Sequence, residues 1–522
     1  MNAKLTLAQQ AAWSAVFQSQ LQEFSYEIVE IEGQLPDTLR GSTLFRNGPG
    51  RFERGGQRVR HYLDGDGYLY RLAFACDGRV YFEAKFVRTA EYLREQAAEQ
   101  FLFRSTFGTQ TSVRSWTKVW ANTLELYLKN PANTHIVPWG GKLLALYEAG
   151  LPYRIDPRTL KTVGQENLNG ELVERPLPHS RWETFQRLSR GWQAMTAHPH
   201  FDPVRNRLVI WSWSMAKRLG RPDILTIKLR EYDRHWTEIA RKTYTMSEAA
   251  VNPHDFALTP SYYLFFENRL AFNPWPFLLG THAPADCLRM LSDRPTRLHV
   301  VPRPDGPQSD RTPVVLETGH WFSIHQAFAC DRADGSVEIY STGWPASGLQ
   351  GGFLTSWGGD APDFDAIAPT FLWKTTVHPA KRTIEHRITP GAERCCIDHP
   401  HPNPNFETQP ARYLYMTYSN AQGESSPPIG YLKLDLHTGE QQLWLAPPLS
   451  ITEEPIFVPK YDGSQEDDGF ILGIVYDHQQ QRSSLVVLDA ANIATGPVCR
   501  LWLNHRLVHG LHGSWCRQYY GP

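Results

Sequence analysis

Four histidines stand in four short motifs that lie far apart in the chain: His198 in TAHPHFDP, His254 in NPHDFALTP, His325 in WFSIHQAF and His512 in GLHGSW. The intervals of 56, 71 and 187 residues exclude a local zinc finger. Each motif sets the histidine beside apolar residues or a turn former, as at the end of a strand. Neutral imidazole binds iron, zinc, copper and nickel. The motifs therefore predict one metal ion held by imidazoles from four distant segments.

The other histidines are candidates for packed or surface positions. The chain has 20 histidines, and a single histidine without a partner motif is more often a structural residue than a metal ligand. Seven of them lie near the four motifs: His200, His320, His378, His399, His401, His505 and His509. We expect none of these seven to bind the metal.

Short strands dominate the sequence after residue 24. Apolar residues alternate in RVYFEAKFVR and in DILTIKLREYD, and similar runs recur in LVIWSWS, YYLFFEN, SVEIYS, RYLYMTYS and FILGIVYD. Many short strands separated by turns are typical of a sandwich, a barrel or a propeller. With four strands per blade, a chain of 522 residues fits a propeller of about seven blades best. A propeller would also bring one ligand from each of several blades to a common axis.

The N-terminal segment has a helical pattern. Thr6 can cap a helix over residues 7–24, in which Trp13, Val16, Phe17, Leu21 and Phe24 recur at helical spacing. We expect this helix to pack on the propeller. No linker rich in proline, glycine or serine divides the chain, so residues 1–522 are predicted to form a single domain.

Composition excludes several classes of function. The formal net charge is -1 and no basic stripe is present, which argues against binding to nucleic acid. Seven cysteines without regular spacing argue against a disulfide framework and favour the reducing cytoplasm. The N-terminus lacks the apolar core of a secretory signal, and no stretch approaches the roughly 20 apolar residues of a membrane span.

Several further motifs, taken in order, resemble one family. LPDTLRGSTLFRNGPGRF, HYLDGDGYLY, NPANTHIV, LLALYEAGLPYRID and EEPIFVPK surround the four histidine motifs in the order seen in the carotenoid cleavage oxygenases, and most closely in their cyanobacterial apocarotenoid oxygenase type. The resemblance runs from about residue 25 to residue 517. It implies an all-β fold, a seven-bladed β-propeller with a cap of helices and loops over an axial metal.

The resemblance also assigns roles to residues. It implies that His198, His254, His325 and His512 bind Fe(2+) and that Glu148, Asp398 and Glu454 each hold an imidazole. A carboxylate of this kind accepts the second ring N–H of a ligand and so fixes its orientation. Thr134 in ANTH matches a family position beside the open face of the iron, where a methyl group restricts access.

The sequence departs from the family pattern at three places. Asp398-His399-Pro400 stands where the family usually has glutamate, phenylalanine and proline, which leaves open whether the shorter Asp398 side chain reaches its imidazole. Gln326-Ala327-Phe328-Ala329 follows His325 where His-x-Asn-Ala is common, and Tyr68 replaces a methionine. We expect altered surroundings for His325.

The implied reaction is the oxidative cleavage of a C=C bond of a carotenoid or apocarotenal by O2, which gives two carbonyl products. No flavin or dinucleotide fingerprint is present to supply electrons, so the substrate itself must be electron-rich. Cleavage of stilbenes is the nearest alternative within the family, followed by retinoid isomerohydrolysis. A non-catalytic carrier of apolar ligands and a zinc hydrolase are alternatives from other classes.

An apolar substrate also needs a route from a membrane. RLAFNPWPFLLG follows the His254 motif, and the resemblance implies that this segment dips into a membrane surface. Packing under the cap explains the same residues equally well. The apolar residues concerned are Phe272, Trp275, Phe277, Leu278 and Leu279. The expected location is the cytoplasm, with peripheral association to a membrane.

Overall fold

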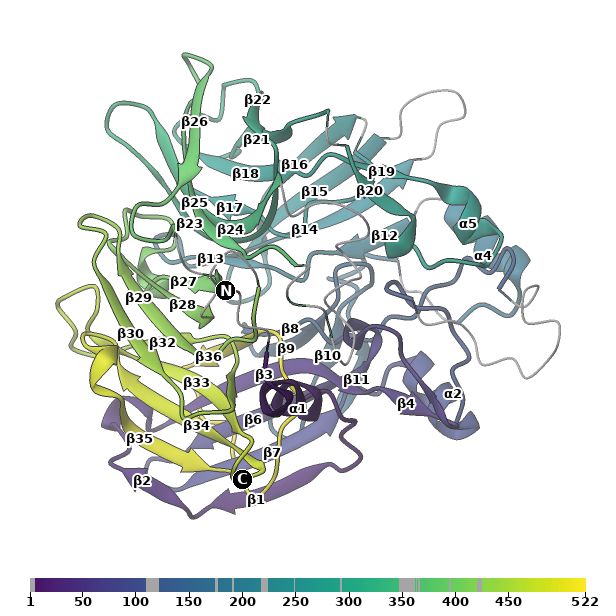
Figure 1. Ribbon diagram of the computed structural model, residues 1–522. Coiled ribbons are helices and arrows are strands. Elements are labelled where there is room, and N and C mark those ends of the chain that lie inside the picture. The colour runs from purple at the N-terminus through teal and green to yellow at the C-terminus, as the bar shows by residue number, and fades with distance from the viewer. Residues whose placement is uncertain are drawn as a thin grey trace.

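The computed structural model describes residues 5–108, 122–173, 177–189, 192–216, 224–247, 249–291, 293–346, 362, 364, 367–393, 396–419 and 425–522. Seven antiparallel sheets of four to six strands are found in these ranges and are arranged around a centre (Figure 1). This arrangement confirms the predicted seven-bladed β-propeller.

The first three blades contain the N-terminal half of the chain and one C-terminal strand. Blade one has the order β1 (Phe24–Ile28), β7 (Val80–Phe86), β6 (Asp66–Phe74), β3 (Ser42–Arg51) and β36 (Gly513–Cys516). Blade two is β11 (Thr162–Gln165), β10 (Tyr153–Ile155), β9 (Lys142–Leu146) and β8 (His135–Trp139). In blade three, β12 (Trp192–Met195) and β13 (His200–Asp202) both pair with β14 (Arg207–Ala216), followed by β15 (Ile224–Tyr232) and β16 (Glu238–Ser247).

The remaining four blades follow in chain order. Blade four is β17 (Ala257–Leu258), β18 (Tyr262–Glu267), β21 (Thr296–Pro302) and β22 (Val314–Gly319), and blade five is β23 (Trp321–Asp331), β24 (Val337–Pro345), β25 (Phe371–His378) and β26 (Thr383–Ile388). Blade six is β27 (Cys396–His401), β28 (Tyr413–Ser419), β29 (Gly430–Asp435) and β30 (Gln441–Leu445). In blade seven, β31 (Ser450–Thr452) and β32 (Ile456–Pro459) pair with β33 (Gly469–Asp477), then come β34 (Arg482–Asp489), β35 (Pro497–Trp502) and β2 (Ile31–Gly33).

The two ends of the chain close the ring together. The C-terminal strand β36 completes blade one against β3, with Arg46 opposite Gly513, and the N-terminal strand β2 completes blade seven against β35. Purple and yellow segments therefore share both blades in Figure 1. Because β36 is the edge strand of its blade and follows His512 directly, ring closure and placement of this histidine depend on the same strand.

Burial follows the alternation predicted from the sequence. In β7, every second residue from Val80 to Phe86 is buried, whereas all of β6 is buried because it lies between two strands and between two neighbouring layers. One cluster of buried residues joins blades one and seven through side chains such as Leu72 and Leu472. The core thus lies between consecutive blades.

The N-terminal helix is shorter than predicted. Helix α1 spans Leu7–Ala15, with Val16 as its C-cap, and strand β1 begins at Phe24. Thr6 caps the helix as expected. The helical pattern beyond residue 15 was misleading because Val16 and Phe17 are buried against the propeller instead, and the Gln20 N–H donates to the carbonyl of Gly50 in β3. Tertiary contacts therefore override the local periodicity.

The other helices lie outside the blades. In the part of the chain that the structure describes, the other α-helices are α2 (Ala90–Ala98), α4 (Arg181–Ser189) and α5 (Pro274–Leu278), and Figure 1 shows all three on the right of the view. Two small hairpins accompany them, β4 (Glu53–Arg54) with β5 (Gln57–Arg58) and β19 (Leu270–Phe272) with β20 (Leu288–Met290). Within the described ranges, no helix is long and apolar enough to cross a membrane. The six cysteines found there are all free, and Cys395 lies outside those ranges.

Candidate metal centre

The edge strands of the blades surround the centre of the ring. Contacts join β36 to β8, β13 to β17, β17 to β23, β23 to β27 and β32 to β36. His198 precedes β13, His254 precedes β17, His325 lies within β23 and His512 precedes β36. Four blades therefore each present one histidine from an inner edge.

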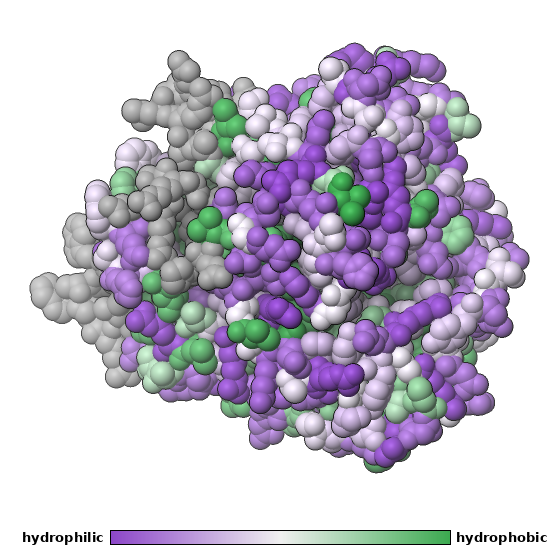
Figure 2. Space-filling model, turned by 180° about the vertical axis from the view of Figure 1, so that it is seen from behind, coloured by the Kyte–Doolittle hydropathy of each residue, from purple (hydrophilic) through white to green (hydrophobic). Residues whose placement is uncertain are grey.

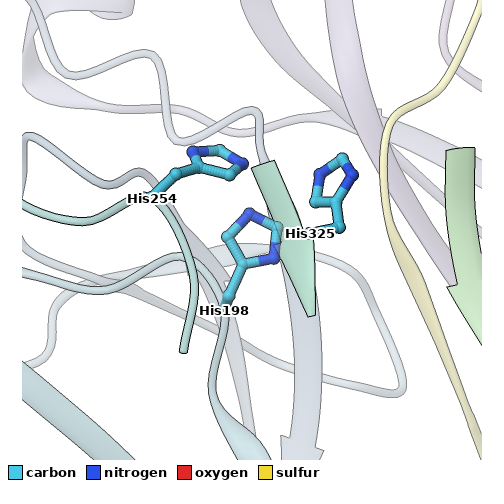
Figure 3. Close-up of side chains that lie close together, drawn as sticks. All are labelled: His198, His254 and His325. Carbon is cyan, nitrogen blue, oxygen red and sulfur yellow. The ribbon is translucent and has the colours of Figure 1, made fainter. Parts of the chain in front are cut away.

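The four imidazole rings form one cluster. His198 is the central member, with ring-centroid distances of 4.4 Å to His254, 5.3 Å to His325 and 4.6 Å to His512. The His325 ring lies 5.2 Å from that of His254 and 5.1 Å from that of His512. Figure 3 shows the rings of His198, His254 and His325 turned toward one another. One nitrogen from each of these three lies within 4.8 Å of the other two.

Three of the imidazoles are held by carboxylates. Nδ1 of His254 lies 2.7 Å from Oε2 of Glu148, and Nδ1 of His512 lies 2.8 Å from Oε1 of Glu454. Nδ1 of His325 lies 2.8 Å from Oδ1 of Asp398. Because each Nδ1–H is directed at a carboxylate, the lone pair of Nε2 is left free to bind a metal ion.

Asp398 reaches His325 in spite of its short side chain. Strand β27 leaves regular pairing with β28 between Asp398 and His401, and His399 has a φ of 52°. A bulge of this kind redirects the side chains next to it. Oδ1 of Asp398 also accepts from the Thr342 hydroxyl at 2.6 Å and from the His399 backbone N–H at 2.8 Å. The bulge thus compensates for the missing methylene of a glutamate.

The surroundings favour uncharged imidazole at two of the four positions. Burial, together with the neighbouring histidines, holds the pKa of His198 well below its usual value. Burial likewise lowers the pKa of His512 far below its usual value, in spite of Glu454. Burial disfavours the charged form of His325 too, but the Asp398 carboxylate outweighs it and raises the pKa of His325. Neutral imidazole is the form that binds metals.

The donor set fits a transition-metal ion. Nε2 of His198 is buried and finds no hydrogen-bond partner in the described part of the chain. A buried polar atom without a partner is costly, and a bound cation would satisfy it. Four nitrogen donors suit iron, zinc, copper or nickel rather than magnesium or calcium.

Further residues around the carboxylates escaped the sequence interpretation. Arg46 of β3 donates to Oε2 of Glu454 at 2.8 Å and to Oε2 of Glu453 at 3.0 Å, and Nε2 of His401 lies 3.0 Å from Oε1 of Glu454. Arg46 lies in the motif LPDTLRGSTLFRNGPGRF, and nothing in its spacing links it to Glu454, which lies 408 positions later. Arg46 thereby fixes the carboxylate that fixes His512.

The glycine in GLHGSW has a steric reason. A Cβ atom on Gly513 would lie 2.4 Å from Cδ of Arg46, and the Gly513 N–H donates to Oε2 of Glu454 at 2.8 Å. Only glycine lets the backbone next to His512 approach Arg46 and Glu454 so closely.

Thr134 lies beside the histidines. Its carbonyl accepts from the backbone N–H of His512 at 3.3 Å, and its side chain is buried. The next residue, His135, has both ring nitrogens near carbonyl oxygens, at 3.0 Å from Ala197 and 3.2 Å from Gly513. His135 therefore acts as a spacer between blades rather than as a fifth donor.

The apolar segment after the His254 motif is only partly packed. Trp275 of α5 is 68% exposed and Leu279, which follows the helix directly, is 55% exposed, whereas Phe272, Phe277 and Leu278 are half-buried. The Arg104 guanidinium covers the Phe277 ring at 4.3 Å. The segment thus divides into a packed side and an exposed side.

Neighbouring segments extend the exposed side. Leu124 donates its backbone N–H to the carbonyl of Leu278 and is itself exposed, and Arg181 of α4 donates to the carbonyl of Thr123. Helix α4 adds the exposed rings of Trp182 and Phe185, stacked at 5.5 Å. Figure 2 shows small hydrophobic areas scattered among hydrophilic ones over both halves of this face of the molecule.

Known proteins are similar to this chain along nearly its whole length. The family model described as retinal pigment epithelial membrane protein matches residues 17–517. The apocarotenoid-15,15'-oxygenase of Synechocystis sp. is 35% identical over 97% of this chain and 96% of its own. Carotenoid cleavage dioxygenase 7 of Oryza sativa is 28% identical over 96% of this chain and 90% of its own.

Two further proteins bear on structure and on substrate class. A crystal structure of cobalt-substituted Synechocystis ACO superposes with a TM-score of 0.85 at 34% identity, covering 97% of this chain and 98% of that one. Resveratrol cleavage oxygenase 1 of Aspergillus fumigatus is 25% identical over 87% of this chain and 85% of its own. On the extent of these matches, the chain belongs to the carotenoid oxygenase family that includes the retinal pigment epithelial membrane protein.

Proposed function

We propose that this protein is a non-haem Fe(II) dioxygenase that cleaves one C=C bond of a carotenoid or apocarotenal. Both atoms of O2 enter the products, so that one double bond becomes two carbonyl groups. The observation that carries the proposal is the cluster of four imidazole rings, three of them held through Nδ1 by carboxylates. Similarity to the apocarotenoid-15,15'-oxygenase supports the substrate class.

A bound ferrous ion would supply the activation of O2. His198, His254, His325 and His512 would hold it, and four ligands leave room for a further partner. Glu148, Asp398 and Glu454 keep the imidazoles oriented. The resting geometry is therefore set before substrate arrives.

The protein contributes position and exclusion of water. The four histidines are buried or half-buried at the inner edges of the blades, so a substrate double bond must enter the interior of the ring to reach them. Thr134 lies next to His512, and we assign its methyl group to limiting access at the open face. A dry site prevents side reactions of the electron-rich polyene.

Substrate delivery from a membrane surface is part of the proposal. Exposed Trp275, Leu279, Leu124, Trp182 and Phe185 come from three neighbouring segments. An exposed apolar patch of this kind suits the interface of a bilayer, where the rings of tryptophan sit readily. We therefore propose a peripheral association through α4 and α5, with the protein otherwise in the cytoplasm.

Stilbene cleavage is the second candidate function. The similarity to resveratrol cleavage oxygenase 1 supports it, because a stilbene presents the same kind of electron-rich double bond. The metal site would serve either substrate, so the distinction depends on the shape of the route to the histidines.

Product analysis tests the proposal. Fe(II)-loaded protein is incubated under 18O2 with an all-trans apocarotenal or with resveratrol, and the fragments are identified by mass. We expect two labelled carbonyl fragments from the apocarotenal and much slower turnover of resveratrol. The reverse preference would favour stilbene cleavage, and stoichiometric iron without either reaction would overturn the catalytic assignment.

His254→Ala serves as the inactive variant in this assay. We expect it to lose both iron and turnover while it keeps the circular dichroism spectrum of a β-protein. His378→Ala is the matched control, because His378 forms a histidine–carboxylate pair with Asp334 at the surface, at 3.7 Å. Retained turnover in His254→Ala would remove this histidine from the metal site.

A further inference from the structure

A fifth histidine reaches the candidate metal centre. His399 follows Asp398 directly, and its ring centroid lies 5.1 Å from that of His325 and 5.3 Å from that of His512. One nitrogen each from His325, His399 and His512 lies within 4.8 Å of the other two. The three rings thus form a second donor group that shares two members with the first set of four.

The backbone turns His399 toward this group. Its φ of 52° lies in the left-handed region, which histidine occupies more readily than most non-glycine residues. The His399 backbone N–H donates to Oδ1 of Asp398 at 2.8 Å, and that same oxygen accepts from His325. One carboxylate therefore fixes both the His325 ring and the backbone that carries the His399 ring.

The ring itself has an unused donor atom. Nδ1 of His399 is buried and, within the described ranges, has no hydrogen-bond partner. Nearby His401 and His135 differ, because His401 binds Glu454 and both nitrogens of His135 lie near carbonyl oxygens. Of these three histidines beside the centre, His399 is the one with a buried ring nitrogen that lacks a partner in the described part of the chain.

The ring contacts of His399 differ from those of His198. His198 touches His254, His325 and His512, whereas the described ring contacts of His399 are with His325 and His512 and not with His198. His399 therefore joins the cluster through His325 and His512.

We propose that His399 is a fifth imidazole ligand of the metal ion that His198, His254, His325 and His512 would hold. The inference rests on the proposed metal centre and adds to it a ligand that the sequence interpretation had assigned to packing. It concerns the resting site of this chain and follows from the position of the His399 ring beside the rings of His325 and His512.

Counting imidazoles around cobalt(II) tests the proposal without any turnover. The protein is loaded with cobalt(II), and X-ray absorption fine structure gives the number of imidazole ligands from their multiple-scattering pattern. We expect five imidazoles in the wild-type protein and four in His399→Phe, a variant of similar shape. Four in the wild-type protein would overturn the inference, and this result does not depend on the folding of any variant.

Chelator competition gives the second measurement. Replacing a residue that merely orients a ligand costs about 10–100-fold in metal affinity, so loss of a direct ligand in His399→Phe should weaken cobalt binding by at least about tenfold. His386→Phe is the matched control, because His386 also has a buried nitrogen without a partner but stacks on Trp373 in blade five. Equal affinity of both variants and the wild type would contradict a ligand role for His399.

The four-histidine centre and the ligand role of His399 can be tested separately. If His254→Ala binds cobalt as tightly as the wild type, the four-histidine centre itself is wrong, and with it the proposed function. If His254→Ala loses cobalt while the wild-type protein shows four imidazoles and His399→Phe keeps full cobalt affinity, only the role of His399 is wrong.

Discussion

At the scale of single residues, the site depends on pairs of an imidazole and a carboxylate. Glu148, Asp398 and Glu454 come from different blades than the histidines they hold, or from the loops between them. A metal ligand aimed by a fixed acceptor loses less freedom on binding than a free side chain. The departure from glutamate at Asp398 is therefore the most direct place to test this role.

Replacing Asp398 should weaken the metal site without destroying it. In Asp398→Ala, the His325 ring loses the acceptor for Nδ1, and we expect metal affinity to fall by about 10–100-fold. Chelator competition with cobalt(II) measures the change. Asp334→Ala provides the control, because Asp334 faces His378 at the surface. An unchanged affinity in Asp398→Ala would remove this carboxylate from the site.

At the scale of elements, short inner strands are locked together by buried polar groups. His200 of β13 lies between two carboxylates, with Nε2 2.8 Å from Oδ1 of Asp255 and Nδ1 hydrogen-bonded to Glu407. Burial lowers the pKa of His200, but Asp255 and Glu407 outweigh it and raise the pKa to about 10. A charged imidazolium thus links blade three to the segment before β17 and to the loop after β27.

This link predicts a loss of stability at high pH. Since the folded pKa of about 10 exceeds the usual value of 6.5, the contribution is complete below about pH 6.5 and is lost as the pH rises through 10. The free energy of unfolding in urea should fall by on the order of 3 kcal/mol between pH 7 and pH 9.5 on this account. His200→Gln should be less stable at pH 7 and show a flatter profile, and an equally steep profile would assign the loss to other groups.

Helix α5 allows a test of membrane association. Trp275→Ser with Leu279→Ser removes two exposed side chains, and burial of each is worth roughly 1.5–3 kcal/mol. We expect binding to phosphatidylcholine vesicles in a flotation assay to drop by about tenfold or more. Leu445→Ser on β30 is the control, because Leu445 is 52% exposed but lies on the outer strand of blade six. Equal flotation of both variants would argue that the segment serves packing alone.

At the scale of the whole molecule, ring closure and the metal site share the same residues. Arg46 of β3 pairs with Glu453 and Glu454 beside β31 and β32, and it faces Gly513 of β36. N-terminal, C-terminal and blade-seven segments therefore meet at one buried guanidinium. The tips of these strands cannot separate without exposing the carboxylate that holds His512.

Removing Arg46 should destabilise the closed ring. Arg46→Leu leaves two buried carboxylates without their cation, and breaking such a pair costs about 3–5 kcal/mol. Denaturant unfolding measures the loss. Arg387→Leu, which breaks an exposed pair with Glu385 at 3.3 Å, should change stability by no more than about 0.5 kcal/mol. Similar stability of both variants would show that the ring closes without Arg46.

Much of this architecture follows from local sequence. Alternation in segments such as Val80–Phe86 and the recurrence of short strands indicate an all-β propeller, because a strand must bury one face or both. The helix over residues 7–24 was overestimated for the same reason: periodicity reports which residues are apolar, but not which partner buries them. Val16 and Phe17 find theirs in the propeller.

By itself, the sequence determined the class of fold, the family resemblance and the four histidine motifs, since these depend on residue types and short spacings. The tertiary structure alone decided which side chains meet across hundreds of residues, including Arg46 with Glu454 and His399 with His325 and His512. The reason is geometric: a bulge in β27 and the closure of the ring set the direction of these side chains, and neither is encoded in the spacing of the residues concerned.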